Sequence, residues 1–76
     1  MRDILWDKVM LEDFRRLACL TEDEDMVLTG WAKGWSIAKI AMHCHFSERS
    51  VNDIIKVIRR KYDSVYIYSP LLPSRK

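Results

Sequence analysis

The stretch IAKIAMHCHFSERSVNDIIKVI, residues 37–58, carries two blocks of apolar residues at helical spacing, separated by a short break. Intervals of three and four residues place apolar side chains on one face of a helix. The inward residues are expected to be Ile37, Ile40, Ala41 and Cys44 in the first block, and Val51, Ile54, Ile55 and Ile58 in the second. The stretch therefore predicts two helices joined by a turn of roughly three or four residues, a helix-turn-helix.

Three residues at the junction have the properties that such a turn requires. Ala41 is small, so the second helix can cross the first closely at this point. Phe46 supplies an apolar side chain that can plug the turn, and the Ser47 hydroxyl can cap the helix that follows. Each property alone is common, and their combined spacing is what favours the motif.

Capping signals divide the rest of the chain into further helices. Thr21 is followed three residues later by Glu24, the pattern of a capping box, and Gly34 suits the left-handed backbone past a helix end. In the N-terminal segment, Trp6, Met10, Phe14 and Leu17 follow helical spacing. We expect helices from about Asp3 to Cys19, from Thr21 to Gly34, from Ser36 to His45 and from Ser47 to about Lys61 or Tyr62.

The C-terminal segment has a different composition. The run Val65–Tyr68 is rich in strand formers, so we expect it to be extended, either packed on the domain, paired across a dimer or irregular. The predicted fold class is all-α, a small bundle of about four helices containing a helix-turn-helix, with a short extended tail. Residues 1–68 are expected to form a single domain, with an N-terminal helix over 1–19, the helix-turn-helix core over 20–62 and a flexible tail over 69–76.

The charge of the chain is divided unevenly along its length. Residues 1–32 carry four basic and eight acidic side chains, net −4, whereas residues 33–76 carry nine basic and three acidic ones, net +6. The formal net charge is therefore only +2 at pH 7. A basic half can face a polyanion while the acidic half faces away, which is typical of nucleic-acid binding.

Composition also indicates where the protein acts. The 76 residues are enough for one domain, and no apolar run approaches the roughly 20 residues that span a bilayer. Asp3 and Asp7 interrupt the early apolar stretch, so no signal peptide is expected. Cys19 and Cys44 do not form a disulfide framework, which favours a reducing, cytoplasmic location.

Four segments carry a resemblance to a known family: LTE at 20–22, AKGWSIAKIA at 32–41, FSERSV at 46–51 and IRRKY at 58–62. Together they make residues 20–62 resemble the DNA-binding domain of the LuxR/GerE class and, more loosely, region 4 of sigma factors. The resemblance implies a helical DNA-binding module that acts in transcriptional regulation. Two features depart from the family: His45 stands at the turn position usually filled by glycine, and Val65–Tyr68 replaces the usual final helix.

In a helix-turn-helix, the second helix lies in the major groove and its outward side chains contact base edges. Arg49 can pair bidentately with guanine and Asn52 with adenine, whereas Glu48 or Asp53 can accept from cytosine or prevent wrong binding. The candidates for base contacts are Glu48, Arg49, Asn52, Asp53 and Lys56. The candidates for phosphate contacts are Lys33, Ser36, Lys39, Ser47, Ser50, Arg59, Arg60 and Lys61.

Other functions find less support in the sequence. The run His43–His45 lacks the spaced ligand pairs of zinc sites, so no metal and no cofactor is expected. The sequence contains no suggestive pairing of nucleophile and base and no phosphate-binding glycine loop, so neither an enzyme nor a small-molecule site is expected. The alternative is a protein-binding helix-turn-helix, such as a small phage or mobile-element factor that acts on polymerase or another regulator, because Glu48 and Asp53 place negative charge on the second helix.

A homodimer is also expected. A lone module of this size makes few base contacts and so binds DNA weakly as a monomer. The apolar stripe of the N-terminal helix exceeds what a three-helix core needs, and it or Val65–Tyr68 is predicted to join the two copies.

Overall fold

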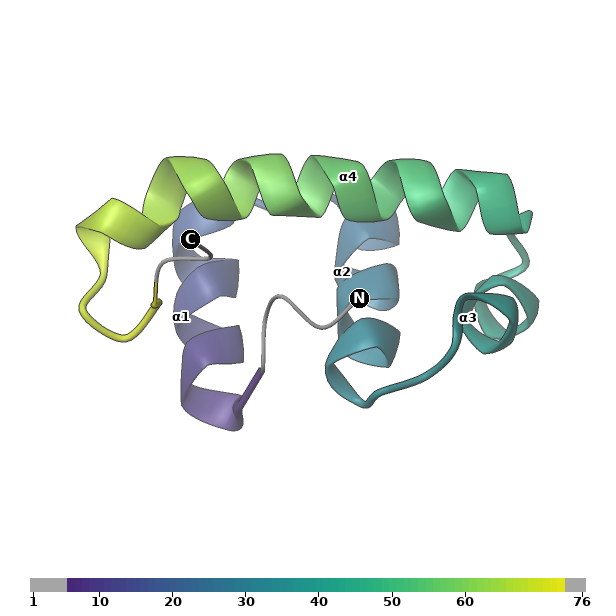
Figure 1. Ribbon diagram of the computed structural model, residues 1–76, viewed down its shortest axis with the longest axis horizontal. Coiled ribbons are helices and arrows are strands. Elements are labelled where there is room, and N and C mark those ends of the chain that lie inside the picture. The colour runs from purple at the N-terminus through teal and green to yellow at the C-terminus, as the bar shows by residue number, and fades with distance from the viewer. Residues whose placement is uncertain (1–5, 74–76) are drawn as a thin grey trace.

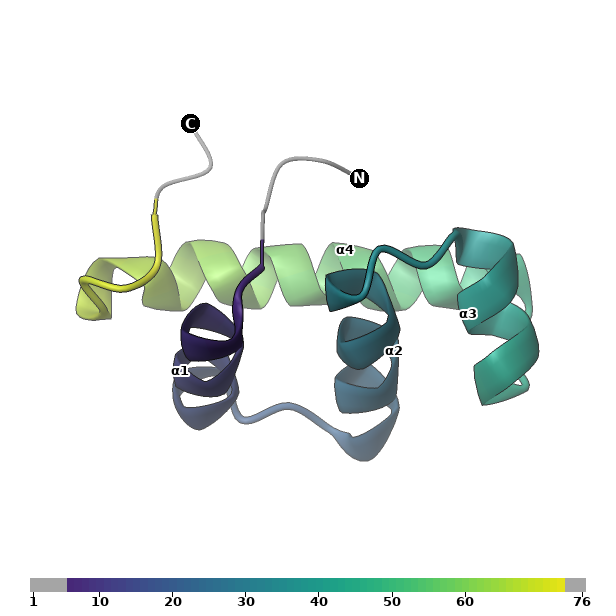
Figure 2. The same cartoon turned by 90° about the horizontal axis from the view of Figure 1, so that it is seen from below.

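The computed structural model describes residues 6–73, which form α-helices and one short 3₁₀ turn. The elements are α1 (Lys8–Ala18), α2 (Glu22–Ala32), α3 (Ile37–Cys44), α4 (Glu48–Val65) and the 3₁₀ turn η1 (Tyr66–Tyr68). In Figure 1, α4 lies along one side of the molecule, α1 and α2 cross it, and α3 lies at its N-terminal end. Figure 2 shows α1 and α2 side by side. The predicted all-α bundle is therefore confirmed.

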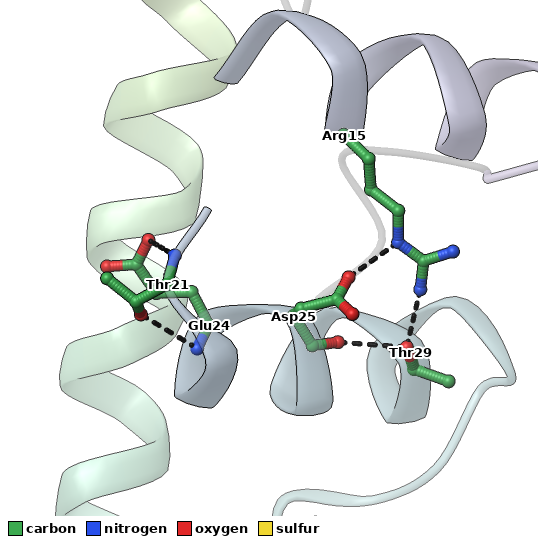
Figure 3. Close-up of polar contacts among 5 residues, drawn as sticks. All are labelled: Arg15, Thr21, Glu24, Asp25 and Thr29. Atoms are coloured by element: carbon green, nitrogen blue, oxygen red, sulfur yellow. Dashed lines mark hydrogen bonds and ion pairs between the residues drawn. The ribbon is translucent and has the colours of Figure 1, made fainter. Parts of the chain in front are cut away.

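Each helix begins at a side-chain cap. Four side-chain oxygens each accept a hydrogen bond from the backbone N–H three residues later, and the capping residues are Asp7, Thr21, Ser36 and Ser47. At α2 the predicted capping box is complete: Glu24 N–H donates to Thr21 Oγ1 and Thr21 N–H donates to Glu24 Oε1, both at 3.2 Å (Figure 3). The helix starts are therefore fixed by local hydrogen bonds that the sequence already encodes.

The start of α1 differs from the predicted one. The sequence predicted that this helix begins near Asp3, and residues 3–5 lie outside the described range. In the structure Asp7 caps α1, and Trp6 precedes the cap. The Trp6 ring packs on three others, with centroid distances of 5.2 Å to Phe14, 5.9 Å to Trp31 and 5.7 Å to Tyr62. Trp6 thus joins the core from the chain before the helix, rather than as part of its apolar stripe.

The core is one cluster that runs along the inner face of α4. Every helix contributes to it, and the largest fully buried side chains are Phe14, Val27, Leu28, Ile40, Val51, Ile55, Ile58 and Tyr62. Burying a side chain of this size stabilises a fold by roughly 1.5–3 kcal/mol relative to its exposed state. The apolar spacing in residues 37–58 therefore predicted correctly which sides of α3 and α4 face inward.

A polar network joins α1 to α2 beside this core. Arg15 Nε donates to Asp25 Oδ1 at 2.5 Å, and Arg15 Nη2 donates to Thr29 Oγ1 at 2.6 Å (Figure 3). The Thr29 hydroxyl in turn donates to the backbone carbonyl of Asp25 at 2.8 Å. One guanidinium group thus spans one turn of α2 and sets the position of the two helices relative to each other.

The prediction for Val65–Tyr68 is wrong. Val65 is the last residue of α4, which passes the expected end at Lys61 or Tyr62, and the next three residues form η1. Tyr62 and Tyr66, one helical turn apart, stack with ring centroids 6.2 Å apart. The helical spacing of partly buried Val65 and Tyr66 continues the inner face of α4, so tertiary packing outweighs the strand propensity of the segment.

The described part of the predicted tail, residues 69–73, packs on the bundle. Ser69 and Leu72 are buried, the Ser69 hydroxyl donates to Asp13 Oδ2, and the Tyr62 hydroxyl donates to the Pro73 carbonyl. The hydrogen bond from Ser69, with that from Arg16, lowers the pKa of Asp13 below its ordinary value. Side-chain contacts with α1 and α4 therefore hold this segment, which composition alone had suggested to be a loose tail.

Gly30 allows α2 and α3 to approach closely. A Cβ atom at Gly30 would lie 2.9 Å from Ile40 Cγ1 and 3.0 Å from Trp35 Cε3. Both distances are shorter than ordinary van der Waals contact, and Ile40 is fully buried and cannot swing away. Glycine is thus required here by packing, because the side chains of Trp35 and Ile40 lie directly against the Gly30 backbone.

We predict that Gly30→Ala lowers the free energy of unfolding by about 1–3 kcal/mol, because the added methyl group overpacks the α2–α3 contact. Denaturant unfolding followed by circular dichroism measures the change. The control is Met26→Ala on the exposed side of the same helix, for which a change within about 0.5 kcal/mol is expected. A Gly30→Ala variant as stable as the unchanged chain would contradict the packing role.

Candidate nucleic-acid interface

The turn between α3 and α4 has the geometry that its sequence predicted. His45 adopts the left-handed conformation, with φ 61° and ψ 38°, and Phe46 N–H donates to the Ala41 carbonyl at 2.9 Å. Ala41 is buried where the chain turns back, and Phe46 is packed against the core. Histidine enters this region more readily than most residues, so it can replace the glycine usual at this position.

The outer face of α4 carries the five residues predicted to contact bases. Glu48, Arg49, Asn52, Asp53 and Lys56 are all exposed. Within residues 6–73 none of these side chains makes a hydrogen bond or an ion pair, so their polar groups are available to a partner. Arg49, Asp53 and Lys56 follow intervals of four and three residues, which align them along one side of the helix, and Arg60 extends this row by one further turn.

The serine candidates for phosphate contacts have structural roles as well. Ser36 and Ser47 cap α3 and α4 through their hydroxyl oxygens. The Ser47 hydroxyl also donates to Ser50 Oγ at 3.0 Å, so these two side chains form a pair at the start of α4. Ser36 and Ser47 are exposed and Ser50 is half-buried, which leaves hydroxyl groups at the surface near both helix starts.

Two of the basic candidates turn away from the outer face of α4. The Lys61 ammonium forms an ion pair with Glu24 on α2 and lies 3.5 Å from the Cys19 carbonyl. The Arg59 guanidinium lies 5.7 Å from the centroid of the buried Trp31 ring. Both side chains are half-buried, and their placement does not support the phosphate contacts predicted for them. Arg60, between them, is exposed and remains a candidate.

The ion pair shifts the titration of Glu24. Partial burial raises the pKa of Glu24, but the hydrogen bond from Lys61 and that from the Thr21 N–H outweigh burial and lower it overall. Glu24 is therefore ionised near neutral pH and compensates the charge of Lys61.

Lys33 and Lys39 both lie over an aromatic ring, that of Trp35, between α2 and α3. Their ammonium nitrogens lie 5.2 Å and 4.6 Å from the centroid of the Trp35 ring, within the range of cation–π attraction. The His43 ring meets the same indole edge-on, with centroids 4.9 Å apart. The two lysines are among the phosphate contacts that the sequence predicted, whereas Trp35 was not assigned to the site. Its position two residues after one lysine and four before the other is the signal that could have indicated it.

No protein-family model matches the chain, and the comparisons with curated proteins and with solved structures found no match either. The resemblance of residues 20–62 to the LuxR/GerE class therefore remains a prediction. Within residues 6–73, no helix is long and apolar enough to cross a membrane. In the same range, no three His, Cys, Asp or Glu side chains lie together as possible metal ligands.

We predict that Lys61→Met destabilises the fold at neutral pH by up to about 1 kcal/mol and that this loss disappears in acid. The reason is that a carboxyl group with a lowered pKa stabilises the fold at pH values above its ordinary pKa, which is 4.5 for Glu24. This contribution is lost as the pH falls through the pKa of the folded state. Urea unfolding at a series of pH values measures it. Arg60→Met serves as the exposed control, and a loss independent of pH would contradict the role of the ion pair.

Proposed function

We propose that this protein binds double-stranded DNA in a sequence-dependent manner through its helix-turn-helix and acts in transcriptional regulation. The observation that carries the proposal is the exposed polar row on α4, whose side chains have no partner within residues 6–73. This row begins directly after the turn, which is the part of a recognition helix that enters the major groove. The proposal gives the protein no catalytic role and places it in the cytoplasm, with the DNA.

The side chains of this row suit distinct contacts. Arg49 has the planar donor pair that matches guanine, and Asn52 has the donor and acceptor that match adenine. Lys33, Lys39 and Arg60 are exposed cations suited to phosphate oxygens. Glu48 and Asp53 repel phosphate, and they restrict binding to sites where a cytosine amino group meets the carboxylate.

We predict that the protein retards a random pool of DNA duplexes and that its affinity falls steeply as salt rises, because bound cations displace condensed counterions. Sequencing the bound fraction yields the preferred site. Arg49→Ala should then weaken binding to that site by about 1–3 kcal/mol and relax its sequence preference. Lys39→Ala should weaken all sequences alike and reduce the salt slope by about 0.9.

Lys8→Ala, on the exposed side of α1, is the matched control and should change neither property. If no duplex is retarded even at low salt, the DNA-binding proposal is wrong. The alternative, a helix-turn-helix that binds another protein, would then be favoured, because acidic side chains on α4 suit a basic protein surface as well.

We also propose that the protein acts on DNA as a homodimer joined at its C-terminal end. Ile67, Tyr68 and Leu71 expose 65%, 72% and 47% of their surface, which is unusual for apolar side chains gathered within five residues of the sequence. Val9, 57% exposed, lies one turn before Asp13 on α1, and Asp13 contacts Ser69 in the same C-terminal segment. These side chains therefore belong to one end of the molecule, opposite α3 (Figure 1).

We predict that sedimentation detects a dimer at high concentration and that the double variant Ile67→Asp/Tyr68→Asp is a monomer, because charge at the interface opposes its burial. The control is Met42→Asp, which places a charge at an exposed methionine of α3, away from the C-terminal end. A strictly monomeric unchanged chain would contradict the dimer, and dimerisation of the double variant would place the interface elsewhere.

A further inference from the structure

The indole of Trp35 is held firmly between α2 and α3. The Trp35 backbone N–H donates to the Gly30 carbonyl at 3.1 Å, and the ring lies so close to Gly30 that an added Cβ would be 3.0 Å from Cε3. The His43 ring packs on it edge-on at 72°. A half-buried ring with a fixed backbone and packed neighbours has little freedom to reorient, so it can serve as a rigid support for other side chains.

Two cations rest against this support. The Lys33 and Lys39 ammonium groups lie over the indole, and within residues 6–73 neither of them makes an ion pair. This differs from Lys61, whose charge is compensated by Glu24. A neutral ring attracts an ammonium group without cancelling its charge or occupying all three of its donors. Two positive charges are thus held at 5.2 Å and 4.6 Å from the centroid of one ring and remain able to bind an anion.

We propose that Trp35 is a positioning residue that holds Lys33 and Lys39 as a preformed pair for phosphates of duplex DNA. This inference rests on the proposed DNA-binding function. The pair lies where α2 passes into α3, and Lys39 belongs to α3, which packs against α4. The first helix of a helix-turn-helix crosses the DNA backbone beside the groove that the second helix enters, so α3 would bring the pair to that backbone. Because the lysines are already ordered, less side-chain freedom is lost on binding. Trp35 itself does not contact the phosphate.

The test is a double-mutant cycle on DNA affinity. Trp35→Leu removes the aromatic face and keeps an apolar side chain in the gap, and we expect it to weaken binding roughly three- to ten-fold for specific and random duplexes alike. In the Lys33→Ala/Lys39→Ala background the same change should have no further effect, because the side chains that it positions are gone. Trp35→Phe, which retains a smaller ring, should have a DNA affinity between those of the unchanged chain and of Trp35→Leu. It replaces Trp35→Leu in the cycle if Trp35→Leu unfolds.

A second measurement examines the free protein. The ring current of Trp35 should shift the Lys33 and Lys39 ε-methylene protons upfield in NMR spectra, and Trp35→Leu should abolish this shift. An equal loss of affinity in both backgrounds, no loss at all, or the absence of the shift would each overturn the role of Trp35. If the unchanged chain binds DNA while Trp35→Leu binds as well, only this inference fails. If the unchanged chain binds no duplex, the proposed function fails and this inference with it.

Discussion

The apolar stripe of α4, formed by Val51, Ile55, Ile58 and Tyr62, is the surface on which the described fold is built. α1, α2, α3 and η1 all contact α4. With 18 residues, this helix is about 27 Å long and runs through most of the 34 Å length of the molecule. Because all the packing lies on one side of α4, its opposite face is left to solvent and can carry polar groups with no structural duty.

Tyr62 shows how strongly this stripe constrains its surroundings. Its ring is fully buried against Trp6, Phe14 and Tyr66, which come from three separate segments. A buried hydroxyl needs a hydrogen-bond partner, and the Pro73 carbonyl supplies it. A single side chain therefore links the segment before α1, the end of α4 and the chain beyond η1, and it draws the C-terminal residues back onto the bundle.

Ion pairing completes the separation of charge that begins in the sequence. Arg15, Arg16 and Lys61 pair with Asp25, Asp13 and Glu24, so the carboxylates of α1 and α2 neutralise the basic side chains nearest to them. The cations near the α2–α3 connection and on the outer face of α4 have no such partner within residues 6–73, namely Lys33, Lys39, Arg49, Lys56 and Arg60. The positive potential available to a polyanion is therefore concentrated around α3 and the outer face of α4.

The sequence by itself determined the parts of this protein that depend on near neighbours in the chain. The caps at Thr21, Ser36 and Ser47, the inward faces of α3 and α4 and the left-handed His45 follow from local hydrogen bonds and from helical spacing, which a single chain segment contains. The exposure of the five base-contact candidates on α4 follows from the same spacing.

Only the tertiary structure decided what depends on distant segments. Arg59 and Lys61 lie at the edge of the apolar stripe of α4. Helical spacing within α4 does not predict that Arg59 contacts Trp31, or that Lys61 pairs with Glu24, both on α2. Likewise, Val65–Tyr68 has the composition of a strand but is helical, because Val65 and Tyr66 pack against the core and no described segment offers a strand to pair with. Trp35 gains its place from Gly30, where the missing side chain lets α2 and α3 approach. Contacts between segments far apart in sequence, rather than local preference, fixed these features.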